Sequence, residues 1–232
     1  MTLVLLGLMA GLTTTLAGMG GGTLLVLALA LLYDPVTALA VSTPALMLGN
    51  LHRMALYRTH IVWSEAKWLL AGGLPAALVG GFQVSGLPET LISGLMLVVA
   101  LLAMGKQLGL PLKPPAGATL PVAALTGVVS ATSGGGGVIA GPYLLARGLK
   151  GVPYVATGAL GAAGIHLGKI TAYGATGVST TDTLLQGLAL AALIAAGNLL
   201  GERIRRFIGD SRQQRLQLGV MVACVGMALA GL

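Results

Sequence analysis

Two triplets of polar residues lie in apolar surroundings with the same internal spacing. They are Asn50, Arg53 and Tyr57, and then His166, Lys169 and Tyr173. The spacing i, i+3, i+7 puts each triplet on one helical face. A charge inside an apolar helix is costly, so it usually faces the protein interior or a water-filled cavity. We therefore expect Asn50, Arg53, His166 and Lys169 to bind an anion. The alternative is that the two cations snorkel to a membrane interface.

A glycine cluster precedes each triplet. Gly18-Met19-Gly20-Gly21-Gly22 lies in the first half of the chain and Gly134-Gly135-Gly136-Gly137 in the second. A helix that begins after such a cluster has free N–H groups and a partial positive charge at its start, and glycine permits close approach. The residues that we expect to donate to the anion are Gly20, Gly21, Gly22, Gly135, Gly136 and Gly137. The alternative is close helix crossing alone. No Gly-Lys-Ser/Thr follows either cluster, which argues against a phosphate loop.

Hydroxyl side chains flank both clusters and recur in the long third segment. We expect Thr23, Ser42, Thr43 and Ser133 to orient the substrate. Further hydroxyl donors beside the clusters are Thr14, Thr15, Ser130 and Thr132. Pro44 removes one backbone hydrogen bond, so Ser42 and Thr43 either satisfy the freed groups or line the path.

Every carboxylate lies at or beyond the end of an apolar segment. They are Asp34, Glu65, Glu89, Asp182, Glu202 and Asp210. A cation pathway or a carboxylate proton relay would usually place one at mid-span, so the pattern favours an anionic or neutral substrate. We expect no cofactor and no metal. The coupling ion stays open: H⁺, with His166 as the well-placed titratable group, or Na⁺ held by carbonyls and hydroxyls.

The composition is that of a membrane protein. Hydrophobic residues make up 56% of the 232 positions and charged residues 8%, and the mean hydropathy is +0.92. A soluble domain of this size cannot bury so much apolar surface. The net charge of +7 comes from bases that flank apolar spans, which indicates topology rather than nucleic-acid binding. A single cysteine, Cys224, excludes an internal disulfide.

The two halves are copies of each other. Gly11 and Gly127, Val36 and Val152, Tyr57 and Tyr173, and Gly81 and Gly197 recur roughly half the chain apart, as in duplicated transporters. The segments that flank each glycine cluster are marginal or too short to span a bilayer. We therefore predict an all-α polytopic protein with a first repeat over 1–105, a cytoplasmic linker over 106–117 and a second repeat over 118–232. Each repeat contains a Gly-broken pair of short helices and three spanning helices, and both belong to one integrated transmembrane domain.

The basic loops predict the orientation. Loops near 58–67, 106–113, 147–150 and 203–215 carry the bases, and such loops face the cytoplasm. This assignment requires an odd number of crossings per half. The halves are then inverted relative to one another, and both termini lie outside a cell (plasma) membrane that the chain crosses several times.

Several stretches resemble the TauE/SafE family of sulfite exporters. In the first half they are the Gly18 to Gly22 cluster, Asp34-Pro35-Val36-Thr37-Ala38, Val41-Ser42-Thr43, Tyr57-Arg58 and Ile61-Val62-Trp63. In the second half they are the Gly134 to Gly137 run, Val152-Pro153 with Ala156, and the Gly197 to Arg206 tail. The resemblance implies secondary export of small sulfur-containing or organic anions such as sulfite. Family members often have Gly near the place of His60 and an acidic residue near Val62, and these departures bear on the substrate.

The residues and the resemblance together predict a secondary transporter, an exporter of a small organic or sulfite-like anion working by alternating access. Two alternatives stay open: a passive anion channel, and a non-transporting membrane scaffold subunit. We do not expect an enzyme, since the sequence shows no metal-ligand cluster and no nucleophile–base pair. The expected partners are the lipid bilayer, the anion and a second copy in a homodimer, with no nucleic acid.

Overall fold

The described residues of the first half form five α-helices and one short 3-10 turn. A computed structural model describes residues 2–17, 21–110, 118–205, 207–208 and 210–231. The predicted site residue Gly20 and most of the predicted linker lie outside these described residues. The elements of this half are α1 (Thr2–Ala17), α2 (Gly21–Leu32), α3 (Pro35–Leu56), η1 (Arg58–His60), α4 (Trp63–Val84) and α5 (Glu89–Gln107).

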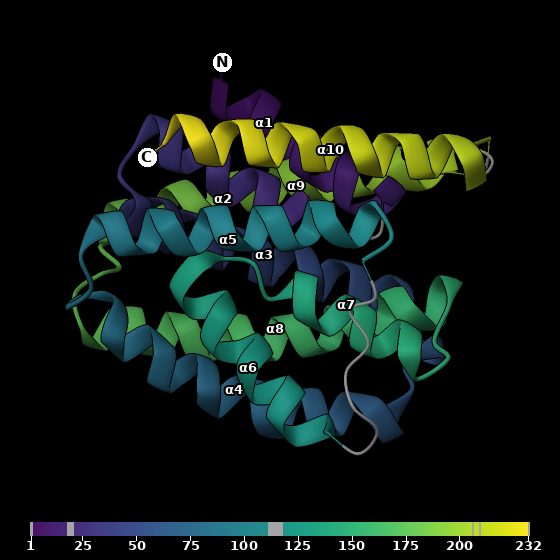
Figure 1. Ribbon diagram of the computed structural model, residues 1–232, viewed down its shortest axis with the longest axis horizontal. Coiled ribbons are helices and arrows are strands. Elements are labelled where there is room, and N and C mark those ends of the chain that lie inside the picture. Colours follow the sequence, from purple (N-terminus) through teal and green to yellow (C-terminus); the bar gives the residue numbers. More distant parts are fainter. Residues whose placement is uncertain (1, 18–20, 111–117, 206, 209, 232) are drawn as a thin grey trace.

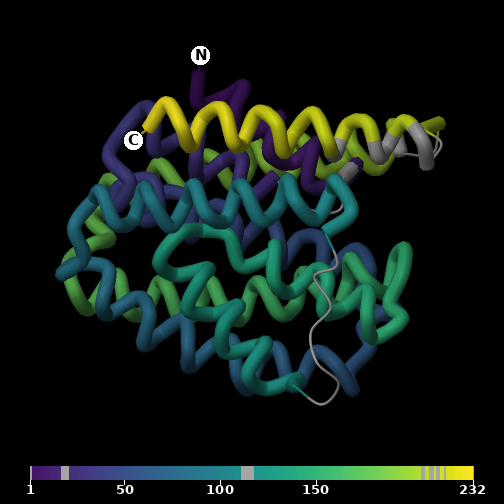
Figure 2. Tube along the Cα trace, viewed as in Figure 1, coloured from purple at the N-terminus to yellow at the C-terminus, as the bar shows by residue number. Residues whose placement is uncertain are grey.

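The second half repeats this order. Its elements are α6 (Thr119–Ser133), α7 (Gly137–Ala146), α8 (Gly151–Ala175), α9 (Thr181–Arg205) and α10 (Asp210–Ala230). No strand occurs in the described ranges, so the all-α prediction is confirmed there. Figures 1 and 2 show α10 along one side of the molecule, α5 across the middle, and α4 and α6 toward the opposite side.

Local chemistry sets the helix ends near the site. Asp34 caps α3, since its Oδ1 accepts a 2.7 Å hydrogen bond from the Thr37 N–H, and Pro35 occupies the first turn. Gly134 ends α6 with a φ of +73°, a left-handed conformation that favours glycine. This turn leads directly into α7, so the second pair of short helices forms a tight hairpin.

The most extensive helix–helix contacts are between the two halves of the chain and not within either half. Helix α1 packs on α9 and α6 packs on α4, while α3 contacts both α8 and α9. Glycine allows the closest crossings. A Cβ added to Gly11 of α1 would lie 2.2 Å from the Ile194 carbonyl oxygen, and one added to Gly127 of α6 would lie 2.2 Å from the Gly73 carbonyl oxygen. These crossings bring backbone against backbone, as is common in membrane helix packing.

The packing scheme of one half is repeated in the other. Gly80 of α4 lies against Val128 and Ala131 of α6, and Gly201 of α9 lies against Leu12 and Thr15 of α1. Gly49 of α3 meets Ile194 of α9, and at the corresponding crossing Ile165 of α8 meets Gly73 of α4. We call positions that correspond under this repetition counterparts. Gly11 and Gly127 are counterparts, as are Gly80 and Gly201.

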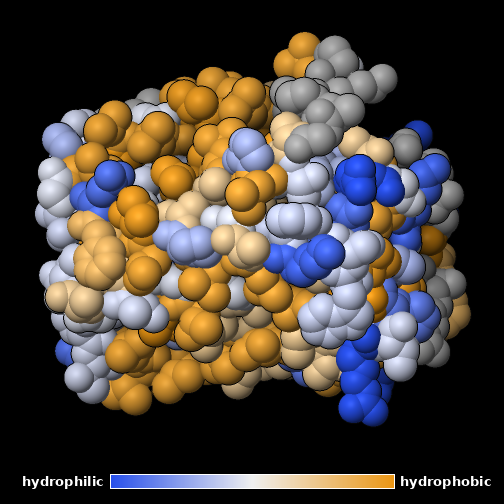
Figure 3. Space-filling view, turned by 90° about the horizontal axis from the view of Figure 1, so that it is seen from below, coloured by the Kyte–Doolittle hydropathy of each residue, from blue (hydrophilic) through white to orange (hydrophobic). Residues whose placement is uncertain are grey.

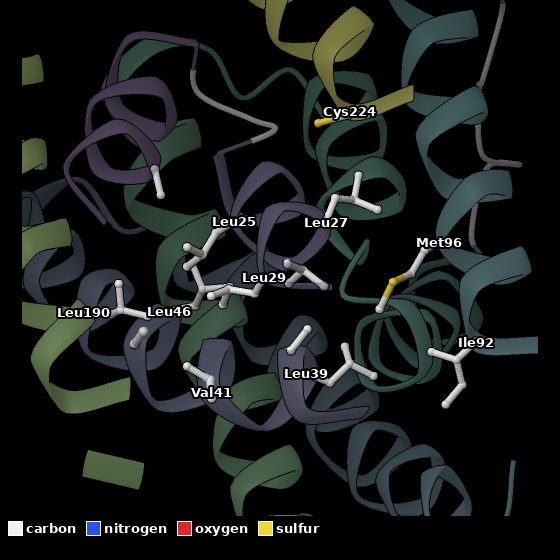
Figure 4. Close-up of a cluster of buried hydrophobic side chains, with 14 of the residues drawn as sticks. Leu25, Leu27, Leu29, Leu39, Val41, Leu46, Ile92, Met96, Leu190 and Cys224 are labelled. Atoms are coloured by element: carbon white, nitrogen blue, oxygen red, sulfur yellow. The ribbon is translucent and has the colours of Figure 1, made fainter. Parts of the chain in front are cut away.

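The largest apolar core lies around α2 and α3. Leu25, Leu29 and Leu39 are fully buried there, together with Ile92 and Met96 of α5. Figure 4 shows these side chains pointing toward one another, with Cys224 of α10 nearby. This core positions the first pair of short helices against α3.

Many large apolar side chains nevertheless lie on the outside. Those that are at least half exposed in mid-helix include Leu5, Val79, Val98, Leu125, Leu167, Leu185 and Val222. Figure 3 shows a broad hydrophobic area on one face with hydrophilic residues gathered mainly toward two edges. In the described chain, Glu89–Gln107 and Thr181–Ile204 are long and apolar enough to cross a bilayer, and five apolar helices are shorter. This surface is suited to contact with lipid.

Candidate functional site

A cavity of about 150 Å³ lies between both pairs of short helices and the long helices α3, α4 and α8. Its polar lining comes from Thr14, Gly22, Thr23, Asn50, Arg53, Thr126, Ser130, Gly136, Gly137, Tyr154 and His166. Its apolar wall includes Leu46, Leu69, Leu144 and Ile165. The cavity thus contains the break between α6 and α7 and one face of each long third helix, where the sequence placed the site.

Arg53, Asn50 and His166 meet in this cavity from two helices. The Arg53 guanidinium donates to the Asn50 side-chain oxygen. Arg53 Nε and His166 Nδ1 are buried and have no hydrogen-bond partner among the described residues. Buried polar groups are normally satisfied, and these two nitrogens are exceptions beside the cavity. A guanidinium offers several donors in a fixed fork, which suits an oxyanion.

The described lining contains no carboxylate, so nothing acidic neutralises Arg53 within the cavity wall. A charged cluster beside the cavity is formed by Glu65, Tyr143 and Arg147, which we call the Glu65 bridge. Glu65 accepts hydrogen bonds from the Tyr143 hydroxyl at 2.7 Å and from Arg147 at 2.8 and 3.0 Å. Its members lie one turn from the lining residues Leu69 and Leu144, so the bridge joins the end of α7 to the start of α4 beside the cavity.

The glycines of the second cluster divide into two kinds. Gly136 and Gly137 line the cavity, and their N–H groups donate to no backbone carbonyl within the described chain. Gly135 instead packs on Val99, since an added Cβ would lie 1.9 Å from a Val99 methyl group. The next two amides of α7 donate to the carbonyls of Gly135 and Gly136. Helix α7 therefore offers only its first amides to the cavity.

The first cluster is arranged differently. Gly22 and Thr23 line the cavity. Gly21 packs against α1, where an added Cβ would lie 2.0 Å from Thr14 Oγ1. The structure thus brings one glycine of this described pair to the cavity and uses the other for helix contact.

Three predicted hydroxyl residues lie beside the cavity rather than in its wall. Ser42 and Thr43 are fully buried in α3 and both donate to the Leu39 carbonyl oxygen, at 3.2 and 2.6 Å. Ser133 donates to the Val129 carbonyl oxygen at 2.8 Å. Their protons are used within their own helices. Both hydroxyls bond to the Leu39 carbonyl oxygen and not to that of Ala40, which loses its helical N–H partner at Pro44, so neither sequence alternative for Ser42 and Thr43 is observed in this structure.

Lys169 is fully buried but is absent from the cavity wall. Its Nζ lies 5.7 Å from the centre of the Tyr173 ring, and it has no hydrogen-bond partner in the described part of the chain. The structure therefore separates Lys169 from Arg53, although the sequence gives them equivalent places.

Two lining residues escaped the sequence analysis. Thr126 lies one helical turn before Ser130 on the same face of α6, and that spacing could have indicated it. Tyr154 lies in the first turn of α8, and no pattern in the sequence indicates that it lines the cavity. Tyr154 lies close enough to Arg53 to interact with it electrostatically, whereas Thr126 lies beside Gly136 at the break between α6 and α7.

The described fold and site together define an all-helical protein with a lipid-suited surface and a cavity between its halves that is lined by Arg53. The family model described as sulfite exporter TauE/SafE matches residues 3–229. The chain therefore belongs to the sulfite exporter TauE/SafE family, a family of membrane transporters. Neither the curated proteins nor the solved structures gave a match.

Proposed function

We propose that this protein is a secondary transporter that exports a small organic or sulfur-containing oxyanion, of the sulfite or sulfonate type, by alternating access. The observation that carries the proposal is the cavity in which Arg53, Asn50 and His166 meet without a carboxylate in the described lining. Its volume of about 150 Å³ is below that of drug-sized pockets, which favours a small solute. Membership of a sulfite exporter family agrees with both features.

The repeated packing supports two repeats of opposite orientation. Gly80 and Gly201 meet counterpart residues, and the Gly49–Ile194 crossing has a counterpart in Ile165–Gly73. The first helix of each half also packs against the fourth helix of the other half, since α1 contacts α9 and α6 contacts α4. In transporters with inverted repeats, the substrate binds at the repeat interface near the bilayer midplane. The cavity lies at this interface here.

The cavity extends toward one end of the molecule. Arg53 lies near the end of α3, Tyr154 near the start of α8 and Leu144 near the end of α7. The adjoining loops are those whose bases predict a cytoplasmic position. In this proposal the structure therefore has its substrate site toward the cytoplasm, as an exporter needs for loading. The coupling ion is H⁺ or Na⁺, with His166 as the group that H⁺ coupling would use.

The test is uptake into proteoliposomes of a panel of labelled anions: sulfite, thiosulfate, a sulfonate and a carboxylate, each with and without a pH gradient. We expect flux of at least one of the sulfur oxyanions and its loss in Arg53→Gln. The matched control is Arg58→Gln, which removes a base from the exposed η1 turn outside the cavity. Equal flux in wild type and Arg53→Gln, or flux of none of the anions, would contradict the proposal.

A further inference from the structure

The two long third helices carry counterpart cations in unlike surroundings. Arg53 of α3 is half-buried and lines the cavity, whereas Lys169 of α8 is fully buried and does not line it. The residues that precede each cation by one turn, Asn50 and His166, both line the cavity. The two halves therefore place equivalent residues at the centre of the site, but they place their two cations differently.

The break extends to the residues around each cation. On the Arg53 side Tyr154, Val155 and Gly158 line the cavity and are partly exposed. Their counterparts across the repeat are Ala38, Leu39 and Ser42, and each of these is fully buried. Figure 4 shows Leu39 within the apolar core, together with Leu29 and Val41. One side of the repeat interface is thus open, and the side that corresponds to it is packed shut.

The packed side of the repeat interface contains a buried ammonium group, which is unusual in an apolar core. Lys169 Nζ has the Tyr173 ring 5.7 Å away and no hydrogen-bond partner among the described residues. Burying a charged or polar group without partners costs free energy, and apolar residues of similar size would pack there without that cost. The burial is explained if Lys169 is exposed to water and to substrate in another conformation of the protein.

We propose that Lys169 is the substrate-binding cation of the oppositely open conformation, in which Ala38, Leu39 and Ser42 line a cavity as Tyr154, Val155 and Gly158 do here. In that state Arg53 is enclosed, and the anion passes from Arg53 to Lys169 while Asn50 and His166 stay at the shared centre. The inference rests on the proposed function and adds to it the residue that receives the anion on the far side.

The first test is the accessibility of single cysteines in proteoliposomes, in a Cys224→Ala background. Gly158→Cys and Ser42→Cys are the paired probes; a Cβ at 158 meets only ordinary contact, 3.4 Å from Leu144. We expect a charged, membrane-impermeant thiol reagent to modify position 158 from the basic-loop side and position 42 from the opposite side during sulfite exchange. Ala100→Cys, fully buried in α5 and outside the cavity wall, is the control and should react from neither side.

The second test separates binding from transport. Lys169→Gln should still bind sulfite, measured as a thermal shift in detergent, because Arg53 is intact, and it should lose transport. Lys169→Arg should restore transport, since arginine already serves at the counterpart position. If the wild type transports sulfite, two results would overturn this inference alone. One is unaltered flux in Lys169→Gln, and the other is a position 42 that does not react from the far side. Absence of wild-type flux of all tested anions would instead overturn the proposed function.

Discussion

The two pairs of short helices share one packing scheme but are held by different polar contacts. In the first pair, Thr15 of α1 donates to Asn198 Oδ1 at 3.0 Å, and Asn198 Nδ2 donates to the Gly49 carbonyl oxygen at 3.4 Å. We call this the Asn198 bridge, and its counterpart positions in the other half hold Ala131 and Ala77. The second pair is held instead by the Glu65 bridge.

The two residues that pair with Glu65 likewise lack polar counterparts. The positions that correspond to Tyr143 and Arg147 of α7 hold Leu27 and Leu31 of α2. Leu27 is buried in the apolar core, and Leu31 is exposed. The glycine crossings therefore determine the shared fold, while the polar bridges are particular to each half. The Asn198 bridge and the Glu65 bridge thus hold the two pairs of short helices by different polar contacts in this conformation.

The largest effect should come from the shared glycine crossings. We expect Gly11→Ala and Gly127→Ala to cost about 3 kcal/mol each, because the new methyl group meets a carbonyl oxygen of a neighbouring helix at 2.2 Å. Thermal unfolding in detergent measures the loss. Gly94→Ala is the control, since its Cβ meets nothing within 4 Å. An unchanged melting temperature in either crossing variant would show that these helices are free to separate.

Removal of the Glu65 bridge should have the next largest effect. Glu65→Gln removes the charge that pairs with Arg147 and weakens the hydrogen bond from Tyr143. We expect a lower melting temperature and faster amide hydrogen exchange in α7 than in α2. In a cycle with Arg147→Gln, the double variant should lose less than the sum of the single ones. Strict additivity would mean that the bridge does not hold α7.

The Asn198 bridge allows the same comparison to be tested by a loss of stability that a second substitution should partly restore. Asn198→Ala leaves the buried Thr15 hydroxyl without its acceptor and should cost about 1 kcal/mol. The double variant Asn198→Ala with Thr15→Ala reproduces the Ala77 and Ala131 pair of the other half. It should recover part of the loss in thermal unfolding. A double variant that is less stable than Asn198→Ala would show that the two crossings are not equivalent.

The smallest effect should come from the helix cap of α3. Asp34 caps this helix, whereas its counterpart Lys150 makes no side-chain cap bond at the start of α8. Asp34→Ala should cost about 1 kcal/mol or less, and Lys150→Ala should cost nothing measurable. Both are measured by thermal unfolding near neutral pH. An equal loss in the two variants would contradict this asymmetry.

The cap should also depend on pH. Partial burial acts to raise the pKa of Asp34, but the hydrogen bonds from Thr37 outweigh it and the net pKa is lowered. A carboxylate whose folded-state pKa is lowered stabilises the fold above its ordinary pKa and loses that contribution as the pH falls through the folded-state value. The difference in stability between wild type and Asp34→Ala should therefore disappear in that acidic window. A difference that grows with acidification would contradict this explanation.

The helices were predictable because glycine, proline and charged residues interrupt the apolar runs. The first glycine cluster was predicted to break a pair of short helices, and α1 ends at Ala17, directly before that cluster. Helix partners were not predictable, because apolar residues face both lipid and protein and thus give no amphipathic pattern. The register of the fourth helices also differs: the sequence paired Gly81 with Gly197, whereas the packing relates Gly80 to Gly201. Helix α8 has 25 residues and α3 has 22, which accounts for part of this shift of α9 along the repeat.

The site was predictable at its centre and less so at its edges. Helical spacing placed Asn50 and Arg53 on one face, and the repeat added His166. Spacing cannot tell which side of a symmetric interface is open, so it gave Lys169 the same place as Arg53. The Glu65 bridge joins residues far apart in the chain, and no local pattern indicates such a contact.

The central claim is that the cavity carries an anion by alternating access, and counterflow tests it most directly. Proteoliposomes loaded with excess unlabelled sulfite are diluted into a trace of labelled sulfite, with no ion gradient. The account predicts that wild-type protein accumulates label transiently above its equilibrium level, and that Arg53→Gln does not. Label that only equilibrates would indicate a passive channel, and label that never enters would indicate a non-transporting scaffold; either result would contradict the account.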